Sequence, residues 1–139
     1  MKRIIAFALY TVLAVAASTA LVAQQPAVKA NIPFDFTVGD QSMPAGGYTF
    51  SSPGRNIVQI QSTDRKHVGL VASSASSHEP AASPVLVFDK YGEYYFLNRI
   101  LCRKTTALNL DIAAGSAEKR IRTREAALRT EERVLVAAR

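Results

Sequence analysis

Residues 31–50 read NIPFDFTVGDQSMPAGGYTF, and this stretch decides the fold class that we expect. From Ala30 to Val38 every second residue is apolar, and the residues between them are polar or proline. Such alternation is typical of a β-strand with one buried and one solvated face. Pro33 has no backbone N–H to donate, so the strand is predicted to lie at a sheet edge or to contain a bulge. The run from Pro44 to Gly47 then predicts a turn.

Short strand-like segments separated by turn residues continue to residue 112. The expected strands are 48–51, 57–62, 67–73, 107–112 and the two arms of a hairpin over 85–101. No segment of helical length separates them, which disfavours a parallel β–α–β arrangement. The sequence therefore predicts a mainly β protein, with a small antiparallel β-barrel or sandwich over residues 28–112. Within it, Cys102 is expected to be a small core residue.

The N-terminal residues have the composition of a targeting segment. Lys2 and Arg3 precede an apolar run from Ile4 to Ala17, and small residues follow this run. This order predicts a helical secretory signal peptide over residues 1–23, cleaved after Ala20 or Ala23. We therefore expect a protein exported to the periplasm or outside the cell. The alternative is an uncleaved N-terminal helix that anchors the protein in the membrane.

The C-terminal residues are rich in Ala, Arg and Glu and contain no Gly or Pro from Ser116 onward. This composition predicts a basic amphipathic α-helix over residues 116–138. Glu118 would lie in its first turn, where the helix dipole favours an anion. Ile121, Leu128 and Leu135 recur every seven residues and would form a narrow apolar stripe. Such a stripe suits loose packing on the domain or self-association through the helix.

The chain has 17 lysine and arginine residues and 11 aspartate and glutamate residues, for a formal net charge of +6 at pH 7. Seven of the basic residues and four of the acidic residues lie from Ser116 onward. The helix could thus attract an anionic envelope surface or, less readily, nucleic acid. A solvated helix face is the alternative interpretation. The candidate contacts are Arg120, Arg122, Arg124 and Arg129.

Aromatic residues crowd the hairpin over 85–101. Aromatic side chains on a sheet bind ligands or partners when basic residues lie among them. The candidate surface consists of Tyr91, Tyr94, Tyr95 and Arg99. The alternative is that these side chains alternate between the core and a face covered by the helix.

No motif in the sequence indicates catalysis. The chain has two histidines and one cysteine, and it lacks the spacings of zinc sites, phosphate-binding loops and serine nucleophiles. We therefore predict no catalytic residue, no metal and no cofactor, and a protein that is not an enzyme. The expected function is that of an exported structural or binding protein, such as an envelope component. The alternatives are a carrier of a small apolar ligand inside the barrel and an anionic-surface binder that uses the Arg-rich helix.

Two blocks of the sequence resemble those of a known family. ANIPFDFTVGDQSMPAGGYTF and VLVFDKYGEYYFLNRI are similar to the IPFDFxVG…PAGxY and LVFxxYGxxYFL blocks of an uncharacterised family of small exported bacterial proteins of the acidobacterial type. The resemblance covers about residues 28–101. It implies a signal peptide, a small β domain and a charged helical tail, but no activity. The chain departs from the family pattern after Ile100, where it reads LCRKTTALNLDI.

Overall fold

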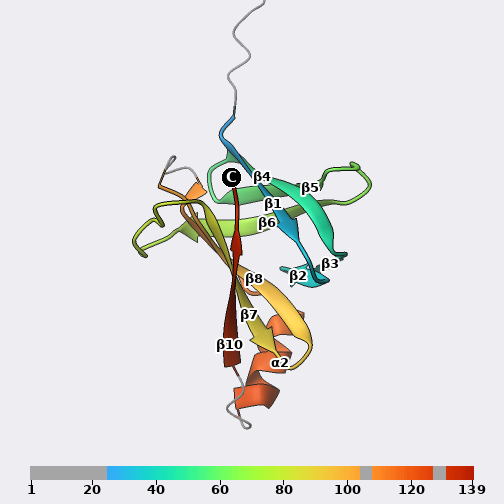
Figure 1. The fold of residues 1–139 in the computed structure, drawn as a ribbon. Coiled ribbons are helices and arrows are strands. Elements are labelled where there is room, and N and C mark those ends of the chain that lie inside the picture. Colours follow the sequence, from blue (N-terminus) through green and yellow to red (C-terminus); the bar gives the residue numbers. More distant parts are fainter. Residues whose placement is uncertain (1–24, 104–107, 127–130) are drawn as a thin grey trace, which may run out of the picture.

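The computed structural model describes residues 25–103, 108–126 and 131–139. These residues form ten β-strands and one α-helix near the C-terminus, which confirms the predicted mainly β class (Figure 1). The strands are β1 (Ala27–Ile32), β2 (Phe36–Val38), β3 (Gln41–Met43), β4 (Gly46–Gly54), β5 (Ile57–Ser62), β6 (Val68–Ala75), β7 (Val85–Tyr91), β8 (Tyr94–Leu101), β9 (Leu110–Ile112) and β10 (Glu131–Ala137), and the helix is α2 (Ser116–Ala126). The predicted signal peptide over 1–23 lies outside the described residues and stays a prediction. Within the described part of the chain, no helix has the length and hydropathy to cross a membrane.

Eight of the strands form one antiparallel series in the order β1-β4-β5-β6-β9-β8-β7-β10. The end of the chain after β10 lies beside β1, because the backbones of Lys29 and Arg139 exchange two hydrogen bonds of 2.8 and 2.9 Å. Beside this pair, Ala138 forms a bridge with Ala30. The two ends of the series therefore meet, as in the barrel form of the predicted fold.

Large apolar side chains fill the space between the strands. In Figure 1, β4, β5 and β6 cross the upper half of the molecule while β7 and β10 run vertically below them, so the two groups cross at a steep angle. The ring of Phe36 contacts the rings of Tyr48 and Phe88, with centroids 5.2 and 5.5 Å apart. Cys102 is buried in the same core, as predicted. The protein's own side chains thus occupy the interior, which argues against an apolar ligand carried inside.

The predicted strand over residues 30–38 is in fact two strands. β1 ends at Ile32, directly before Pro33, and β2 begins only at Phe36. Because Pro33 cannot donate to a ladder, the chain leaves β4 at this point, and β2 pairs instead with β3 and with β8. Phe34 lies in the connection, and its ring stacks on that of Tyr95 with centroids 4.0 Å apart.

The predicted helix over residues 116–138 is wrong in its extent. The helix ends at Ala126, and Glu131–Ala137 forms β10, which pairs with β7 along its whole length. Val134 and Val136 pack against the core, and Leu135 between them points outward. This period of two suits a strand, and the paired edge of β7 outweighs the local helical propensity. Leu135 therefore takes no part in a helical stripe, and Leu128 lies outside the described residues.

The turn between β2 and β3 holds the first residues of α2. One carboxylate oxygen of Asp40 accepts hydrogen bonds from the backbone N–H of Ser116 at 2.7 Å, from its hydroxyl at 2.8 Å and from the N–H of Ala117 at 3.3 Å. The Ser116 hydroxyl is the main reason that the pKa of Asp40 lies below its ordinary value of 3.8. Beside this cap, the backbones of Gly39 and Gly115 touch so closely that a Cβ on Gly115 would overlap the Gly39 carbonyl. The start of the helix is therefore fixed by residues far away in the sequence.

The backbone contact predicts that Gly115→Ala destabilises the fold. The added methyl group has backbone in its way, so the free energy of unfolding should fall by about 2 kcal/mol or more. Gly54→Ala is the matched control, because a Cβ there meets nothing within 4 Å. Urea unfolding of both variants checks this expectation, and equal midpoints for the two would contradict it.

The cap predicts a stability difference that depends on pH. Because folding lowers the pKa of Asp40 below 3.8, its stabilising contribution is present above this pH and is lost as pH falls further. Asp40→Ala should lower the melting temperature by a few degrees at neutral pH and have a much smaller effect under acid conditions. Asp40→Asn keeps an acceptor for Ser116 and should retain more stability than Asp40→Ala. Thermal unfolding followed by circular dichroism at several pH values measures all three chains.

Candidate functional site

The four residues of the predicted hairpin surface do not lie on one face. Tyr91 is only 3% exposed, and its ring contacts that of Phe96 on the side of the sheet that α2 covers. Tyr95 points to the opposite side, toward Phe34, because neighbouring residues of a strand alternate. Tyr94 is 61% exposed. Tyr91 and Tyr95 therefore pack on opposite sides of the hairpin while Tyr94 is exposed, and a ligand-binding role for these residues stays a prediction.

Arg99, the fourth residue of that prediction, belongs to a separate polar cluster. Its Nε lies 3.4 Å from a carboxylate oxygen of Asp111 on β9. The same oxygen accepts the hydroxyl of Ser76 at 2.9 Å, and Nδ1 of His78 lies 3.3 Å from that hydroxyl. Serine, histidine and aspartate thus meet here, but the serine proton is directed at the aspartate and not at the histidine. This order differs from a nucleophilic triad, in which the histidine stands between the other two.

The outer face of α2 carries a concentration of positive charge. Lys119, Arg120, Arg122 and Arg124 are all exposed, and the structure gives none of these four an ion pair within the described residues. Glu118 is buried, so this acidic side chain of the helix turns inward while the four cations are exposed. Three of the four predicted arginine contacts therefore share one exposed helix, and Arg129 lies outside the described residues.

Two carboxylates meet between α2 and the sheet. Glu118 is only 3% exposed, and its Oε1 has no hydrogen-bond partner within the described residues. Asp89 on β7 is also buried, where it accepts the amide of Asn98 at 2.7 Å and lies 3.7 Å from Nε of Arg133. Burial, and then the charge of Asp89, raises the pKa of Glu118 above its ordinary value of 4.5.

Sequence reasoning placed Glu118 in the first turn of the helix and did not anticipate this buried pair. The facing residue, Asp89, stands 29 positions earlier in the chain, so only the packing of α2 on β7 brings the two together. The continuously apolar run before Asp89 was the available signal. A carboxylate that directly follows such a run has a good chance of being buried with the strand.

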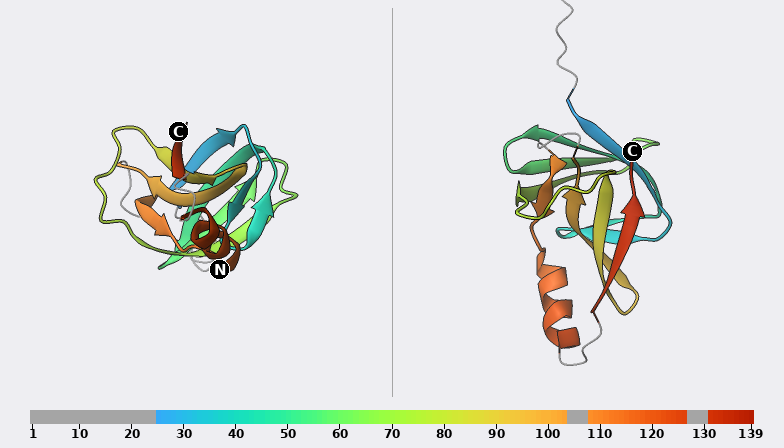
Figure 2. Two further views of the ribbon diagram at one scale, coloured as in Figure 1. Left: turned by 90° about the horizontal axis from the view of Figure 1, so that it is seen from below. Right: turned by 60° about the vertical axis from the view of Figure 1, so that its left-hand side comes forward.

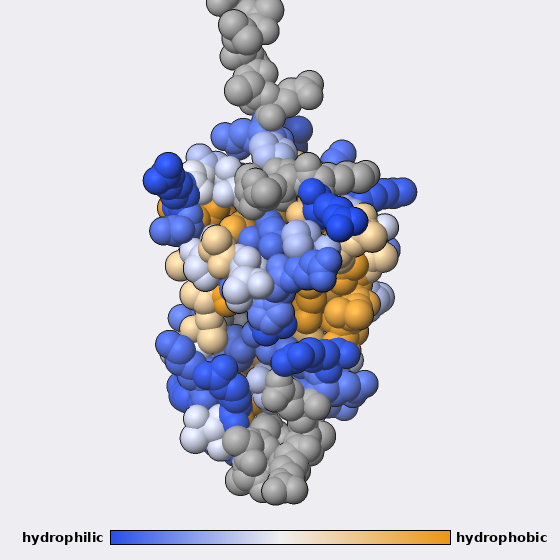
Figure 3. Space-filling model, turned by 90° about the vertical axis from the view of Figure 1, so that its left-hand side faces the viewer, coloured by the Kyte–Doolittle hydropathy of each residue, from blue (hydrophilic) through white to orange (hydrophobic). Residues whose placement is uncertain are grey.

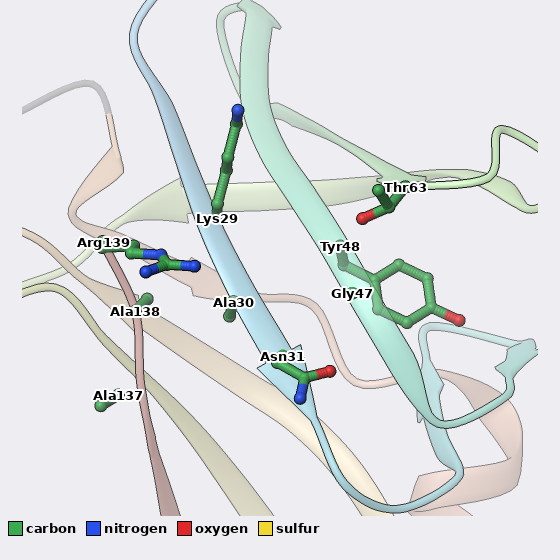
Figure 4. Close-up of a pocket in the computed structure, with 9 residues that line it drawn as sticks. All are labelled: Lys29, Ala30, Asn31, Gly47, Tyr48, Thr63, Ala137, Ala138 and Arg139. Carbon is green, nitrogen blue, oxygen red and sulfur yellow. The ribbon is translucent and has the colours of Figure 1, made fainter.

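A surface hollow of about 650 Å³ lies over β1 (Figure 4). Lys29 on β1 and Arg139, which follows the end of β10, border this hollow, and Asn31 lies further along β1. Tyr48 also borders it, but its hydroxyl is used in a hydrogen bond of 2.6 Å to the carbonyl of Pro44. The hollow thus offers two cations and one amide to a solvated anion, without a buried polar group to orient it.

Comparison with protein-family models, curated proteins and solved structures found no match to this chain. The resemblance to the family of small exported proteins therefore stays a prediction. Function has to be argued from the geometry of the described residues alone.

The buried carboxylate pair predicts that Glu118→Gln stabilises the protein at neutral pH. Because folding raises the pKa of Glu118, its contribution is most favourable below pH 4.5 and declines as pH rises through the folded-state value. Removing the buried charge should therefore increase the free energy of unfolding by on the order of 1 kcal/mol at neutral pH. Urea unfolding across the pH range measures this gain.

The control for this variant is Glu93→Gln, which removes the same charge from an exposed turn. It should leave the unfolding midpoint unchanged at every pH. A loss of stability in Glu118→Gln at neutral pH would show that the ionised carboxylate is a favourable part of the fold.

Proposed function

We propose that this protein is an exported, non-enzymatic binding protein that attaches to an anionic surface of the cell envelope through α2. The observation that carries the proposal is the row of four exposed cations on one short helix, Lys119, Arg120, Arg122 and Arg124. Positive side chains at a membrane surface gain energy from anionic lipids, and several such charges add up. The export step rests on the composition of residues 1–23.

The anchoring of α2 supports this role. The Asp40 cap holds the first turn of the helix, and the contact between Gly39 and Gly115 fixes its position. On the opposite side of the helix, Glu118 is packed against the sheet. The cations are thus presented from a rigid support, which reduces the entropy that binding would otherwise cost.

Figure 2 supports the same assignment through the place of the helix. In the right-hand view, α2 extends below the strands and stands beside the lower ends of β7 and β10. A helix in this position can meet a flat surface without obstruction from the barrel. The packed interior makes the alternative of a carried apolar ligand less favourable, and nucleic acid becomes a second outcome of the test below.

Attachment through α2 predicts that charge removal from the helix abolishes binding. The triple variant Arg120→Gln, Arg122→Gln, Arg124→Gln should bind mixed phosphatidylglycerol and phosphatidylcholine vesicles about 100-fold more weakly than the wild type. Binding of the wild type should also weaken strongly when salt is raised from about 0.05 to about 0.5 M. Co-sedimentation measures both effects.

The matched control removes three exposed cations elsewhere, as Arg55→Gln, Arg65→Gln, Lys66→Gln. This variant has the same net charge as the first and should keep most of the affinity. Pure phosphatidylcholine vesicles report any affinity of residues 1–23 for lipid itself. Equal losses in the two triple variants would point to net charge alone and contradict a site on α2. Binding to DNA without binding to vesicles would contradict the envelope role.

A further inference from the structure

The outer face of β8, β7 and β10 carries an apolar patch that α2 leaves uncovered. On β10, Leu135 is 67% exposed and pairs with Val87 of β7. Ala137 pairs with Val85, which in turn pairs with Leu101 of β8. Directly paired residues of antiparallel strands point to the same side of the sheet. We define the β10 patch as the exposed Leu135 and Ala137 together with the half-buried Val85 and Leu101; Val87, which pairs with Leu135, is itself buried at 4% exposure.

The β10 patch and α2 share one face of the sheet. Asp89 and Arg133 form an ion pair on this face. Asp89 stands two residues after Val87 on β7, and Arg133 stands two residues before Leu135 on β10. Asp89 is also the carboxylate that faces Glu118 of α2. The helix therefore covers one end of the face, and the β10 patch is the part beyond it. Figure 3 shows the resulting surface, in which an apolar area is bordered above and below by hydrophilic residues.

Exposed cationic side chains border the β10 patch. Arg133 is more than half exposed, and Arg103 is exposed close to Leu101 in the sequence. Two of the acidic groups near the patch are matched, since Asp111 pairs with Arg99 and Asp89 with Arg133. With the cations of α2 at its other end, this face is complementary to a negatively charged surface and not to a second copy of itself.

We propose that the partner of this face is an anionic lipid bilayer, into whose headgroup region Leu135 and the β10 patch insert while the cations of α2 contact the phosphates. This inference rests on the proposed function and deepens it by naming lipid as the anionic surface. Apolar side chains that enter the boundary between headgroups and acyl chains add a component to binding that salt does not screen. An exposed apolar patch beside a cluster of cations combines the two components.

The insertion can be followed with tryptophan, because the chain contains none. Leu135→Trp places the only indole of the protein on the β10 patch. Leu70→Trp places it on β6, at a position that is 64% exposed and lies outside the patch. With mixed phosphatidylglycerol and phosphatidylcholine vesicles, the emission of Leu135→Trp should shift to the blue and be quenched by brominated lipid. The emission of Leu70→Trp should stay unchanged.

A second pair of variants measures the contribution to affinity. Leu135→Ser should bind the mixed vesicles about tenfold more weakly than the wild type, because it no longer buries a leucine side chain. The binding that remains should be fully reversible by salt. Leu70→Ser, which removes an equally exposed leucine, should bind like the wild type. All these chains carry the same N-terminus, so any lipid affinity of residues 1–23 is equal in them.

Co-sedimentation of the same samples separates this inference from the proposed function. If the wild type sediments with mixed vesicles but the emission of Leu135→Trp does not shift, attachment through α2 stands and insertion of the β10 patch is wrong. If the wild type does not sediment, the proposed function fails and this inference fails with it. A blue shift that grows with protein concentration in the absence of lipid would assign the β10 patch to a second copy and overturn the inference.

Discussion

The hydrogen bonds from Ser116 and Ala117 to Asp40 are the contact on which the path of residues 116–139 depends. They place the start of α2 against the β2–β3 turn, where two glycines allow the backbones to touch. From this point the helix packs on β7, with Glu118 facing Asp89. The chain can then return as β10, pair with β7 and reach β1 again. One cap thus sets the path by which the barrel closes.

The acidic and basic side chains are used in different ways. Asp40 caps a helix, Asp111 pairs with Arg99, and the carboxylates of Asp89 and Glu118 are buried. These four acids are therefore engaged in contacts of the fold, whereas the cations of α2 remain in solvent. This separation turns a modest net charge of +6 into a locally strong positive surface.

Alternate residues of β10 point to the core and to the outside of the sheet. Val134 and Val136 complete the core, and Leu135 between them remains on the outside. A strand that only closed the barrel would not need a leucine at this exposed position, because an exposed apolar side chain adds nothing to the core. The proposed contact with lipid gives this residue a function and joins it to the cations of α2 on one face.

The sequence by itself determined the local structure of this protein: alternation marked the β class, turn residues separated the strands, Cys102 was placed in the core, and Ser116 marked the start of a helix. These features are visible because they depend on neighbouring residues. Only the tertiary structure decided that Pro33 divides a strand, that residues 131–137 extend along β7, and that Glu118 faces Asp89. Each of these depends on a partner distant in the sequence, and pairing energy with such a partner outweighs local propensity. The arginine cluster of α2 could therefore be predicted from the sequence, but the exposed position of Leu135 on β10 could not.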